Sequence, residues 1–384
     1  MQRYVKPRPS HTHVLLGGTA LLMALLLVSR SQITMEHMRS GMLICVRTMI
    51  PSLFPFMVVS ELIVKSGAGE MAARYPAALL RPLLCVPSEA VCALLLGWLC
   101  GFPVGSRVAA VYLRAGRLTK RQFNLVVCCC NVPSSAFLIS AVGLSLFGNA
   151  ALGRWLLALA LGASLTVGIA FRFLLPRTKD WSCGVAKAVS HGDGGRGQLL
   201  PAAISSAAFG MLNVCATVLL FSAFVGTLTH TLDTLPVGAW VRTAVYGLFE
   251  LSTGVCSASA LSSPAAAAVL CAAIVGWAGL SVHCQILSVC DGCPVAMGWF
   301  WLSRAVQALL CGGGMALLIR MGWVQVVTLP EPTVLRELMV SGGAAETGSF
   351  GYGLSIVCSV SFAGALLVAA YDALQRKRKR GEEI

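Results

Sequence analysis

The chain contains apolar segments of membrane-spanning length that are interrupted near their centres by helix-breaking residues. The stretch GWLCGFPVGSRVAAVYLRAG, residues 97–116, is a clear case, with Gly101, Pro103 and Gly105 in its middle. Hydrocarbon offers no water to bond a freed N–H or C=O group, so each must find a partner inside the protein. An interrupted segment must therefore pack against protein or line a wet cavity, and this requirement restricts the fold more than any other feature.

Composition fixes the class of protein to which these segments belong. Of the 384 residues, 57% are hydrophobic and only 11% are charged, which is too few charges to cover a soluble domain of this length. The sequence therefore predicts an all-α polytopic membrane protein. Its 16 cysteines lie mostly in apolar runs, where a thiol behaves as a small hydrophobic group.

The charges indicate how the segments cross the bilayer. The net charge of +14 is carried by loops and segment ends, which follows the positive-inside rule and gives no reason to predict nucleic-acid binding. We predict that both termini are cytoplasmic. The predicted order is a cytoplasmic N-terminus with the first span (1–34), a first repeat (35–174), a cytoplasmic linker (175–197), a second repeat (198–321), an extracytoplasmic loop (322–350), and a last span with a basic tail (351–384).

The segment after the first span is predicted to return to the cytoplasm. It covers residues 38–65 and contains Pro51 and Pro55, which are expected to break or kink it because proline removes a backbone donor. Basic residues follow as far as Arg81. We therefore expect a cytoplasmic loop between this segment and the next.

Interruptions recur in the same order in both halves. Residues 88–116 have basic residues on both sides, and each arm of roughly a dozen residues makes ~18 Å of helix, about half the hydrocarbon thickness. This segment is predicted to be a re-entrant hairpin, and the next span is broken at 131–133. The second half has a hairpin broken at ELSTG (250–254) and a span broken at GWAGLS (276–281).

The charge pattern places the first hairpin on the cytoplasmic side and the second on the outside, so the two repeats are predicted to be inverted. Inverted repeats whose broken helices meet near the bilayer midplane are typical of secondary transporters, which bind their substrates there. The alternative is that Gly and Pro only kink ordinary spans.

The ends of the broken helices supply candidate binding groups. A helix that starts after a break presents unpaired N–H donors and partial positive charge, suited to an anionic or polar group, and carbonyls before a break could hold a cation. Small hydroxyl residues gather at the breaks, although helix–helix contact explains them equally well. The candidate substrate- or ion-binding residues are Gly101, Pro103, Gly105, Ser106, Asn131, Ser134, Glu250, Ser252, Thr253, Gly279, Ser281, His283 and Gln285.

Ionisable side chains deep in apolar segments are expensive and by default mark a functional site with a partner. Glu250 is predicted to face an internal cavity and to contact a cation, a polar backbone end, or an ion-pair partner, for which Arg107 and Arg304 are the candidates. A purely structural ion pair is the alternative. His283 could relay protons, but a hydrogen-bonded structural histidine is the preferred interpretation.

No cofactor, metal site or enzymatic activity is predicted. Cys290 and Cys293 in SVCDGCP have a spacing that a metal or redox site could use, but a loop that happens to hold two thiols is the preferred interpretation. The sequence contains no Gly-rich phosphate loop, no HExxH pair and no nucleophile elbow. An intramembrane hydrolase would have to rely on His283 beside a serine or cysteine.

Four stretches at the breaks carry a family resemblance: MIPSLFPFMVVSELIV, GFPVGSRVAAVYLRAGRLTKRQFNLVVCCCNVPSSAFLISAVG, FELSTGV and GLSVHCQILS. They resemble the YlbJ-type sporulation integral membrane proteins of endospore-forming bacteria. Those proteins carry the Gate, or nucleoside-recognition, module, which is also associated with concentrative nucleoside transporters and ferrous-iron permeases. The chain departs from the family in Trp277-Ala278-Gly279, where a glycine pair is usual, and in the run CCC before Asn131.

The resemblance implies a multi-pass protein of the bacterial cell membrane, a role in spore formation and a transporter-like fold. With the inverted repeats, it favours a carrier that holds a small polar or charged solute, or a cell-envelope precursor, near the bilayer midplane. The expected partners are the lipid bilayer and an unidentified solute or coupling ion, with a homo-oligomer or other sporulation membrane proteins as open alternatives.

The competing hypothesis is a membrane scaffold that is required for spore-envelope assembly, in the cortex or coat, and moves nothing. The two hypotheses predict different structures for the centre of the fold. A water-accessible cavity lined by Ser106, Asn131, Glu250 and Ser281 would favour the carrier, whereas a centre filled by side chains would favour the scaffold.

Overall fold

The computed structural model describes residues 31–68, 74–176 and 199–325, together with scattered positions between 17 and 29. All regular structure in these ranges is helical, which confirms the predicted all-α class. Most of the predicted first span, nearly all of the linker 175–197, and most of the chain from 322 onward lie outside the described residues.

The first half begins with a long helix and continues through shorter ones. Thr119 and Gln122 form a reciprocal capping box at the start of one of these helices, and the Asn149 side chain caps the start of another, as such residues commonly do. The elements are α2 (Ser31–Ile44), the π-helical turn η1 (Cys45–Met49), α3 (Ile50–Lys65), α5 (Arg74–Leu84), α6 (Ser88–Cys100), α7 (Val104–Arg114), α8 (Lys120–Cys129), the π-helix η2 (Phe137–Leu146) and α9 (Ala150–Leu174).

Two expectations for this half need correction. The segment that ends near Arg81 is not only a loop, because α5 forms there and meets α6 at an angle of 104°. Pro51 and Pro55 do not end the segment 38–65, because α2, η1 and α3 follow one another without interruption. Pro51 lies in the first turn of α3, directly after the wider π-helical turn, where a missing N–H is tolerated.

The second half repeats the pattern of broken helices. Its elements are α10 (Leu199–Thr234), α11 (Ala239–Phe249), α12 (Leu251–Ser259), α13 (Pro264–Trp277), α14 (Gly279–Val289) and α15 (Met297–Arg320). The predicted breaks are confirmed: α6 and α7 are separated at 101–103, α8 and η2 near 131–134, α11 and α12 at Glu250, and α13 and α14 at Ala278.

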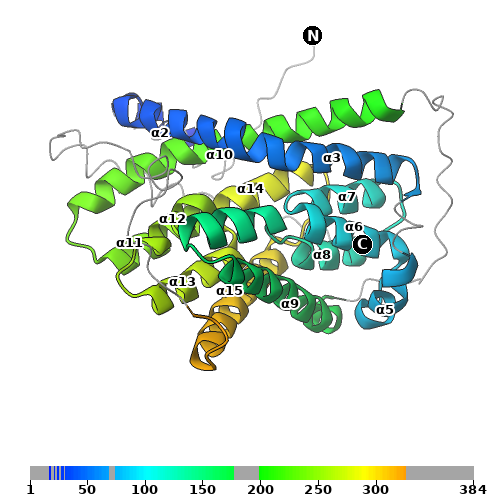
Figure 1. Cartoon of the computed structure of the whole chain (residues 1–384). Coiled ribbons are helices and arrows are strands. Elements are labelled where there is room, and N and C mark those ends of the chain that lie inside the picture. Colours follow the sequence, from blue (N-terminus) through cyan, green and yellow to red (C-terminus); the bar gives the residue numbers. More distant parts are fainter. Residues whose placement is uncertain are drawn as a thin grey trace, which may run out of the picture.

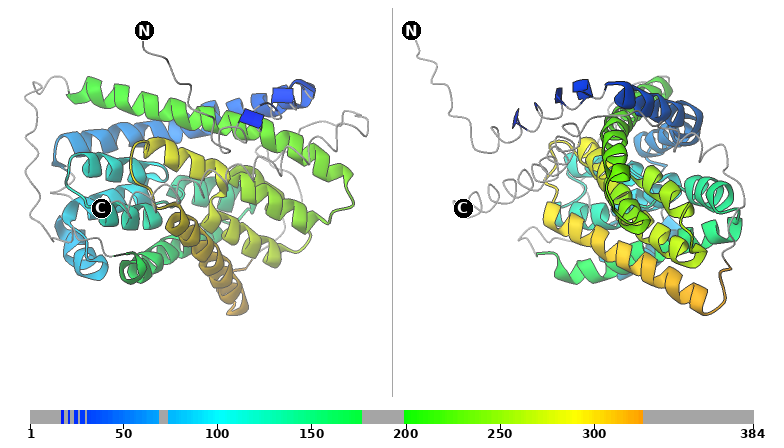
Figure 2. Two further views of the ribbon diagram at one scale, coloured as in Figure 1. Left: turned by 180° about the vertical axis from the view of Figure 1, so that it is seen from behind. Right: turned by 90° about the vertical axis from the view of Figure 1, so that its left-hand side faces the viewer.

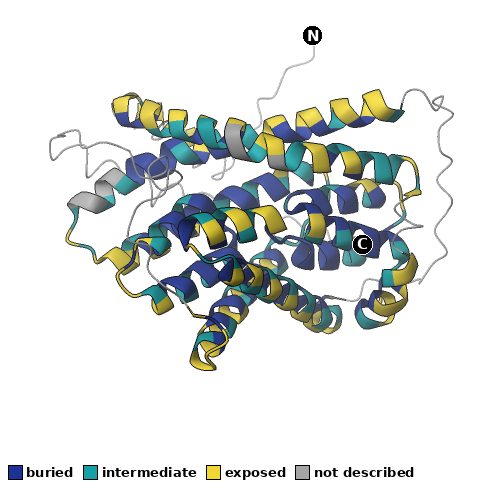
Figure 3. Cartoon of the chain, in the orientation of Figure 1, coloured by how far each residue is buried: buried dark blue, intermediate teal, exposed yellow. Residues whose placement is uncertain are grey.

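Four helical segments of the described chain are long and apolar enough to cross a membrane: Ala150–Leu174, Leu199–Thr229, Pro264–Val289 and Met297–Arg320. The bent pair α5–α6 makes a fifth if its two helices are counted together. The polytopic membrane character is thus confirmed. Figure 3 shows that the broken helices α6, α7, α12 and α14 are mostly buried, whereas α2, α10 and the outer faces of α9 and α15 carry most of the exposed residues.

Two long helices run side by side along one edge of the molecule (Figures 1 and 2). One is the continuous helix α2–η1–α3, and the other is α10, which packs against both α2 and α3. The 36 residues of α10 span roughly 54 Å, which exceeds the hydrocarbon thickness of roughly 30 Å. Helix α10 must therefore tilt strongly or extend beyond the hydrocarbon.

Each hairpin consists of two antiparallel arms that touch along their length. In the first hairpin the Tyr112 hydroxyl, near the end of α7, donates to Cys92 Sγ, near the start of α6, at 3.7 Å. In the second hairpin the hydroxyls of Thr243 and Ser257 lie 2.7 Å apart in the corresponding places. The predicted hairpin shape of both segments is confirmed, while their re-entry into a bilayer stays a prediction.

Packing between the halves shows a reciprocal exchange. Helix α7 of the first hairpin packs against α14 of the second half, and α12 of the second hairpin packs against η2 of the first half. In the same way α8 contacts α15, and α13 contacts α9. Two copies of one unit related by a two-fold axis produce such an exchange. The described packing is of the kind that two related units would produce, while the relation between the two repeats stays a prediction.

Candidate functional site

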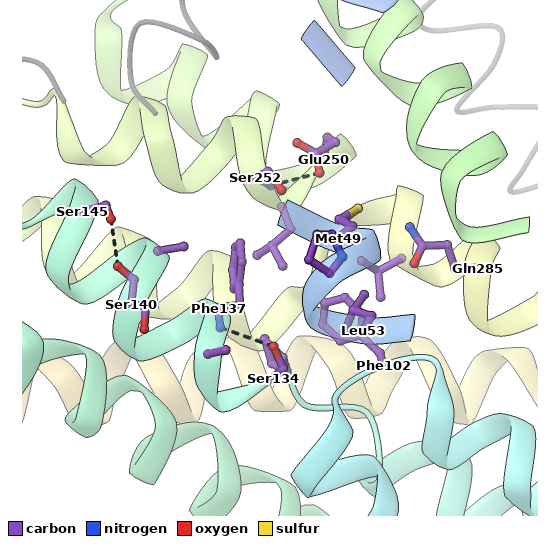
Figure 4. Close-up of a pocket in the computed structure, with 16 residues that line it drawn as sticks. Met49, Leu53, Phe102, Ser134, Phe137, Ser140, Ser145, Glu250, Ser252 and Gln285 are labelled. Carbon is purple, nitrogen blue, oxygen red and sulfur yellow. Dashed lines mark hydrogen bonds between the residues drawn. The ribbon is translucent and has the colours of Figure 1, made fainter. Parts of the chain in front are cut away.

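A cavity of about 440 Å³ lies where the breaks of both halves meet (Figure 4). Both hairpin tips, both broken spans and the long helix around η1 contribute to its wall. The lining residues are Met49, Pro51, Leu53, Phe102, Pro133, Ser134, Ala136, Phe137, Ser140, Ala141, Ser145, Glu250, Leu251, Ser252, Val282 and Gln285. The wall is mostly apolar, with hydroxyls, one amide and one carboxylate as its polar groups.

Glu250 occupies the tip of the second hairpin and caps α12. Its carboxylate oxygens accept the N–H groups of Ser252 at 3.0 Å and Thr253 at 2.6 Å, and the residue is 7% exposed. These bonds satisfy donors at the start of α12, which would otherwise be unpaired. Of the partners predicted for Glu250, the polar backbone end is the one found, and no cation pairs with it in the described part of the chain.

The predicted ion pairs of Glu250 with Arg107 or Arg304 are wrong, because both arginines are engaged elsewhere. Arg107 Nε lies 3.0 Å from a carboxylate oxygen of Glu61 on α3, and its Nη2 donates to the carbonyl and hydroxyl of Ser206 on α10. Arg304 donates to backbone carbonyls at the end of α8. Glu61 and Ser206 were not predicted as partners, although an acid within an apolar run such as 50–64 is itself a signal.

The hairpin tips touch the breaks of the spans that follow them, and glycine makes this approach feasible. A Cβ atom on Gly101 would lie 2.8 Å from the Ser134 nitrogen, and one on Gly279 would lie 2.9 Å from the Leu251 nitrogen. Both glycines also have positive φ angles, 86° and 78°, a conformation that favours glycine. Close backbone packing is therefore kept at the second break, even though Ala278, with a φ of 73°, stands where a glycine is usual.

Four of the predicted residues line the cavity: Ser134, Glu250, Ser252 and Gln285. Ser106, Asn131 and Ser281 do not line it and are at most 1% exposed, so their predicted place in its wall needs correction. Ser106 donates to Asn131 Oδ1 at 2.9 Å, and Asn131 Nδ2 donates to the Val127 carbonyl at 2.7 Å. The polar groups at the first break therefore bond to one another and not to a solute. A freed backbone group in an apolar interior, such as the Val127 carbonyl, needs a partner of this kind.

Other predicted residues lie near the breaks without lining the cavity. Gly105 lies at the crossing of α6 and α7, where a Cβ would come within 2.8 Å of the Gly97 Cα. Pro103, Thr253 and Gly279 flank the hairpin tips and the second break without lining the cavity.

His283 has the contacts of a structural histidine. Its Nε2 lies 2.9 Å from the Trp277 carbonyl at the end of α13, and its ring packs between those of Trp277 and Phe300 at centroid distances of 4.7 and 5.1 Å. Cys290 and Cys293 form a turn in which the Cys293 N–H donates to the Cys290 carbonyl at 2.9 Å. Among the described residues, no group of three or more His, Cys, Asp or Glu side chains could hold a metal ion.

Sequence reasoning missed the apolar wall of the cavity. Phe102 and Phe137 face it from the first half, and Met49 and Leu53 face it from the long first helix (Figure 4). Nothing in their residue types distinguishes them from other apolar residues of a membrane helix. The prolines around Pro51 were predicted to break or kink this helix, and they gave no indication that the helix contributes to a binding site.

Comparison with known proteins places these features in a family context. No family model matches the chain, and no solved structure matches it. The sporulation integral membrane protein YlbJ of Bacillus subtilis is 23% identical to it over 326 residues, which cover 77% of this chain and 80% of YlbJ. The chain is related to YlbJ. The match covers too much of YlbJ to come from one shared motif. It therefore confirms the resemblance seen in the four stretches at the breaks. The assignment of the Gate module stays a prediction.

Proposed function

We propose that this chain is a sporulation protein of the bacterial cell membrane that binds a small polar or charged solute, or an envelope precursor, between its two repeats and carries it across the bilayer. The single observation that carries the proposal is the cavity that both hairpin tips and both broken spans line together. The name of the relative, sporulation integral membrane protein YlbJ, supports the link to sporulation and to the membrane. Cytoplasmic termini, indicated by the basic ends of the chain, are part of the proposal.

The chemistry of the cavity suits a small solute. Its volume of about 440 Å³ lies within the usual range of ligand pockets, roughly 300–1,000 Å³. Glu250 and Ser252 supply polar groups at one end, while Phe102 and Phe137 supply apolar surface. A carboxylate can accept more than the two bonds that Glu250 makes, so it retains capacity for a solute or a coupling ion.

The arrangement of the repeats suits alternating access. Transporters built from two such units bind their substrate at the interface between the units and expose it by moving one unit against the other. Here the exchanged contacts, α7 with α14 and α12 with η2, lie at that interface. Relative motion of the two units would therefore change access to the cavity.

The competing function is a scaffold for spore-envelope assembly. It is favoured by the internal bonding of Ser106 and Asn131 and by the burial of Ser281, since these polar groups could have faced a solute and do not. A scaffold would need the fold but not the cavity. The two functions can therefore be separated by filling the cavity without disturbing the fold.

Replacing Ala141 with tryptophan fills the cavity from η2 and leaves all charges in place. We expect the variant protein to accumulate normally but to fail to restore sporulation in a strain that lacks its own copy, because the solute is excluded. The measurement is spore yield at matched protein level. Leu309→Trp is the matched control, because Leu309 is 76% exposed on α15 and should tolerate tryptophan. Full sporulation with Ala141→Trp would instead support the scaffold.

A further inference from the structure

Arg304 is a buried cation with no carboxylate beside it. The side chain belongs to α15, is 1% exposed, and forms no ion pair in the described part of the chain. A buried guanidinium without compensation is strongly unfavourable. Its surroundings must therefore offer some other source of negative potential.

That source is the C-terminal end of α8. Arg304 Nη1 donates to the Asn131 carbonyl at 2.7 Å, and Nη2 donates to the Cys128 carbonyl at 3.2 Å. Gln307, one turn further along α15, donates to the same Cys128 carbonyl at 2.9 Å. Carbonyls at the end of a helix have no intrahelical partners and carry the negative end of the helix dipole, so this break presents an oxygen-lined position of negative potential.

Neutral donors bond other carbonyls at the breaks. At the end of α8 itself the Cys129 carbonyl accepts from the Trp98 indole at 3.1 Å and from the Ser164 hydroxyl, and at the end of α11 the Leu248 carbonyl accepts from the Trp277 indole at 3.0 Å. The donors there are neutral. Arg172 and Arg121 also donate to carbonyls at the ends of α5 and α9, and Arg114 donates to one just after α14, but these three arginines are partly or fully exposed. At the end of α8 the donating arginine is buried and comes from the opposite repeat.

We infer that the C-terminal end of α8 is a cation site and that the Arg304 guanidinium is its permanent occupant. Carbonyls before a break are the groups with which broken helices coordinate free cations, and here the guanidinium bonds to them directly. The side chain neutralises the freed carbonyls and links the first repeat to α15 of the second. The inference does not rest on the proposed function, because it concerns occupancy of a site and not movement of a solute.

The test removes the occupant and supplies its head group from solution. Purified full-length Arg304→Ala protein in detergent is expected to have an apparent melting temperature lower by roughly 5 °C or more, because truncation removes the donor to the buried Asn131 carbonyl and leaves the Cys128 carbonyl with Gln307 alone. Guanidinium chloride at millimolar, non-denaturing concentration, present from solubilisation onward, should restore about half of the loss in a saturable manner, as binding linkage requires. Urea, which has a similar shape and no charge, should not.

Three further variants keep the test decisive. Arg304→Met fills the space of the arginine stem, so guanidinium should not rescue it. If Arg304→Ala does not fold, Arg304→Lys and Arg304→Gln retain a donor with and without charge, and the lysine variant should be the more stable. Equal rescue by urea and guanidinium, unchanged stability of Arg304→Ala, or a glutamine variant as stable as the lysine variant would each overturn the inference.

Discussion

Gly254→Leu is expected to abolish the accumulation of folded protein. A Cβ atom at this position would lie inside 3.0 Å of the Gly247 Cα, a separation that real Cβ atoms essentially never show. The obstructing atoms are backbone, so no side chain can rotate away. Leucine would force the arms α11 and α12 apart and with them the tip that carries Glu250, and overpacking of this kind is strongly destabilising.

The measurement is the amount of monodisperse protein recovered in detergent at equal expression. Matched controls are Gly162→Leu on α9 and Gly313→Leu on α15, where a Cβ would meet nothing within 4 Å. Both controls should be recovered at the level of the native chain. Normal recovery of Gly254→Leu would show that the two arms do not pack as described.

Replacement of Glu250 is expected to separate its structural role from its proposed binding role. Glu250→Ala removes the acceptor of two buried N–H groups, those of Ser252 and Thr253, and should lower stability by about 2 kcal/mol. Glu250→Gln keeps a carbonyl oxygen as a cap and removes the charge. It should therefore retain most of the stability, yet lose function if the carboxylate binds a solute or ion.

Thermal unfolding and spore yield at matched protein level measure the two effects. Ser252→Ala is the control, because its backbone N–H still reaches Glu250 and only a hydroxyl of the cavity wall is lost. Stability and sporulation that both remain normal in Glu250→Gln would reduce Glu250 to a helix cap and contradict the binding role.

The positions of the breaks could be predicted because the residues that make them are distinctive. Gly101 and Pro103 interrupt an apolar run, and Glu250 introduces a charge into another, so each leaves a mark in the sequence that physical rules can read. Helix boundaries follow from equally local signals, such as the Thr119 capping box. What the sequence predicts well is therefore where the backbone must leave a helix.

The partners of the charged residues could not be predicted in the same way. Arg304 bonds to the carbonyls of Cys128 and Asn131, and a carbonyl has no residue identity that a sequence could reveal. Arg107 could pair with any acid, and the choice of Glu61 over Glu250 depends on how α7 meets α3 and α10. The apolar wall is hidden for the same reason, since Phe102 differs from other phenylalanines only by its place.

Whether the two halves share a water-accessible cavity can be measured by the reaction of introduced cysteines with a small charged thiosulfonate reagent. Each cysteine is introduced alone into a protein whose reactive native thiols have been removed. Ser134→Cys and Ser252→Cys replace residues of opposite halves that line the cavity. Ser106→Cys and Ser303→Cys replace serines that are 0% exposed. We expect the first pair to react from the aqueous phase and the second pair not to react. Failure of both cavity positions to react, or equal reaction at Ser106→Cys, would contradict it.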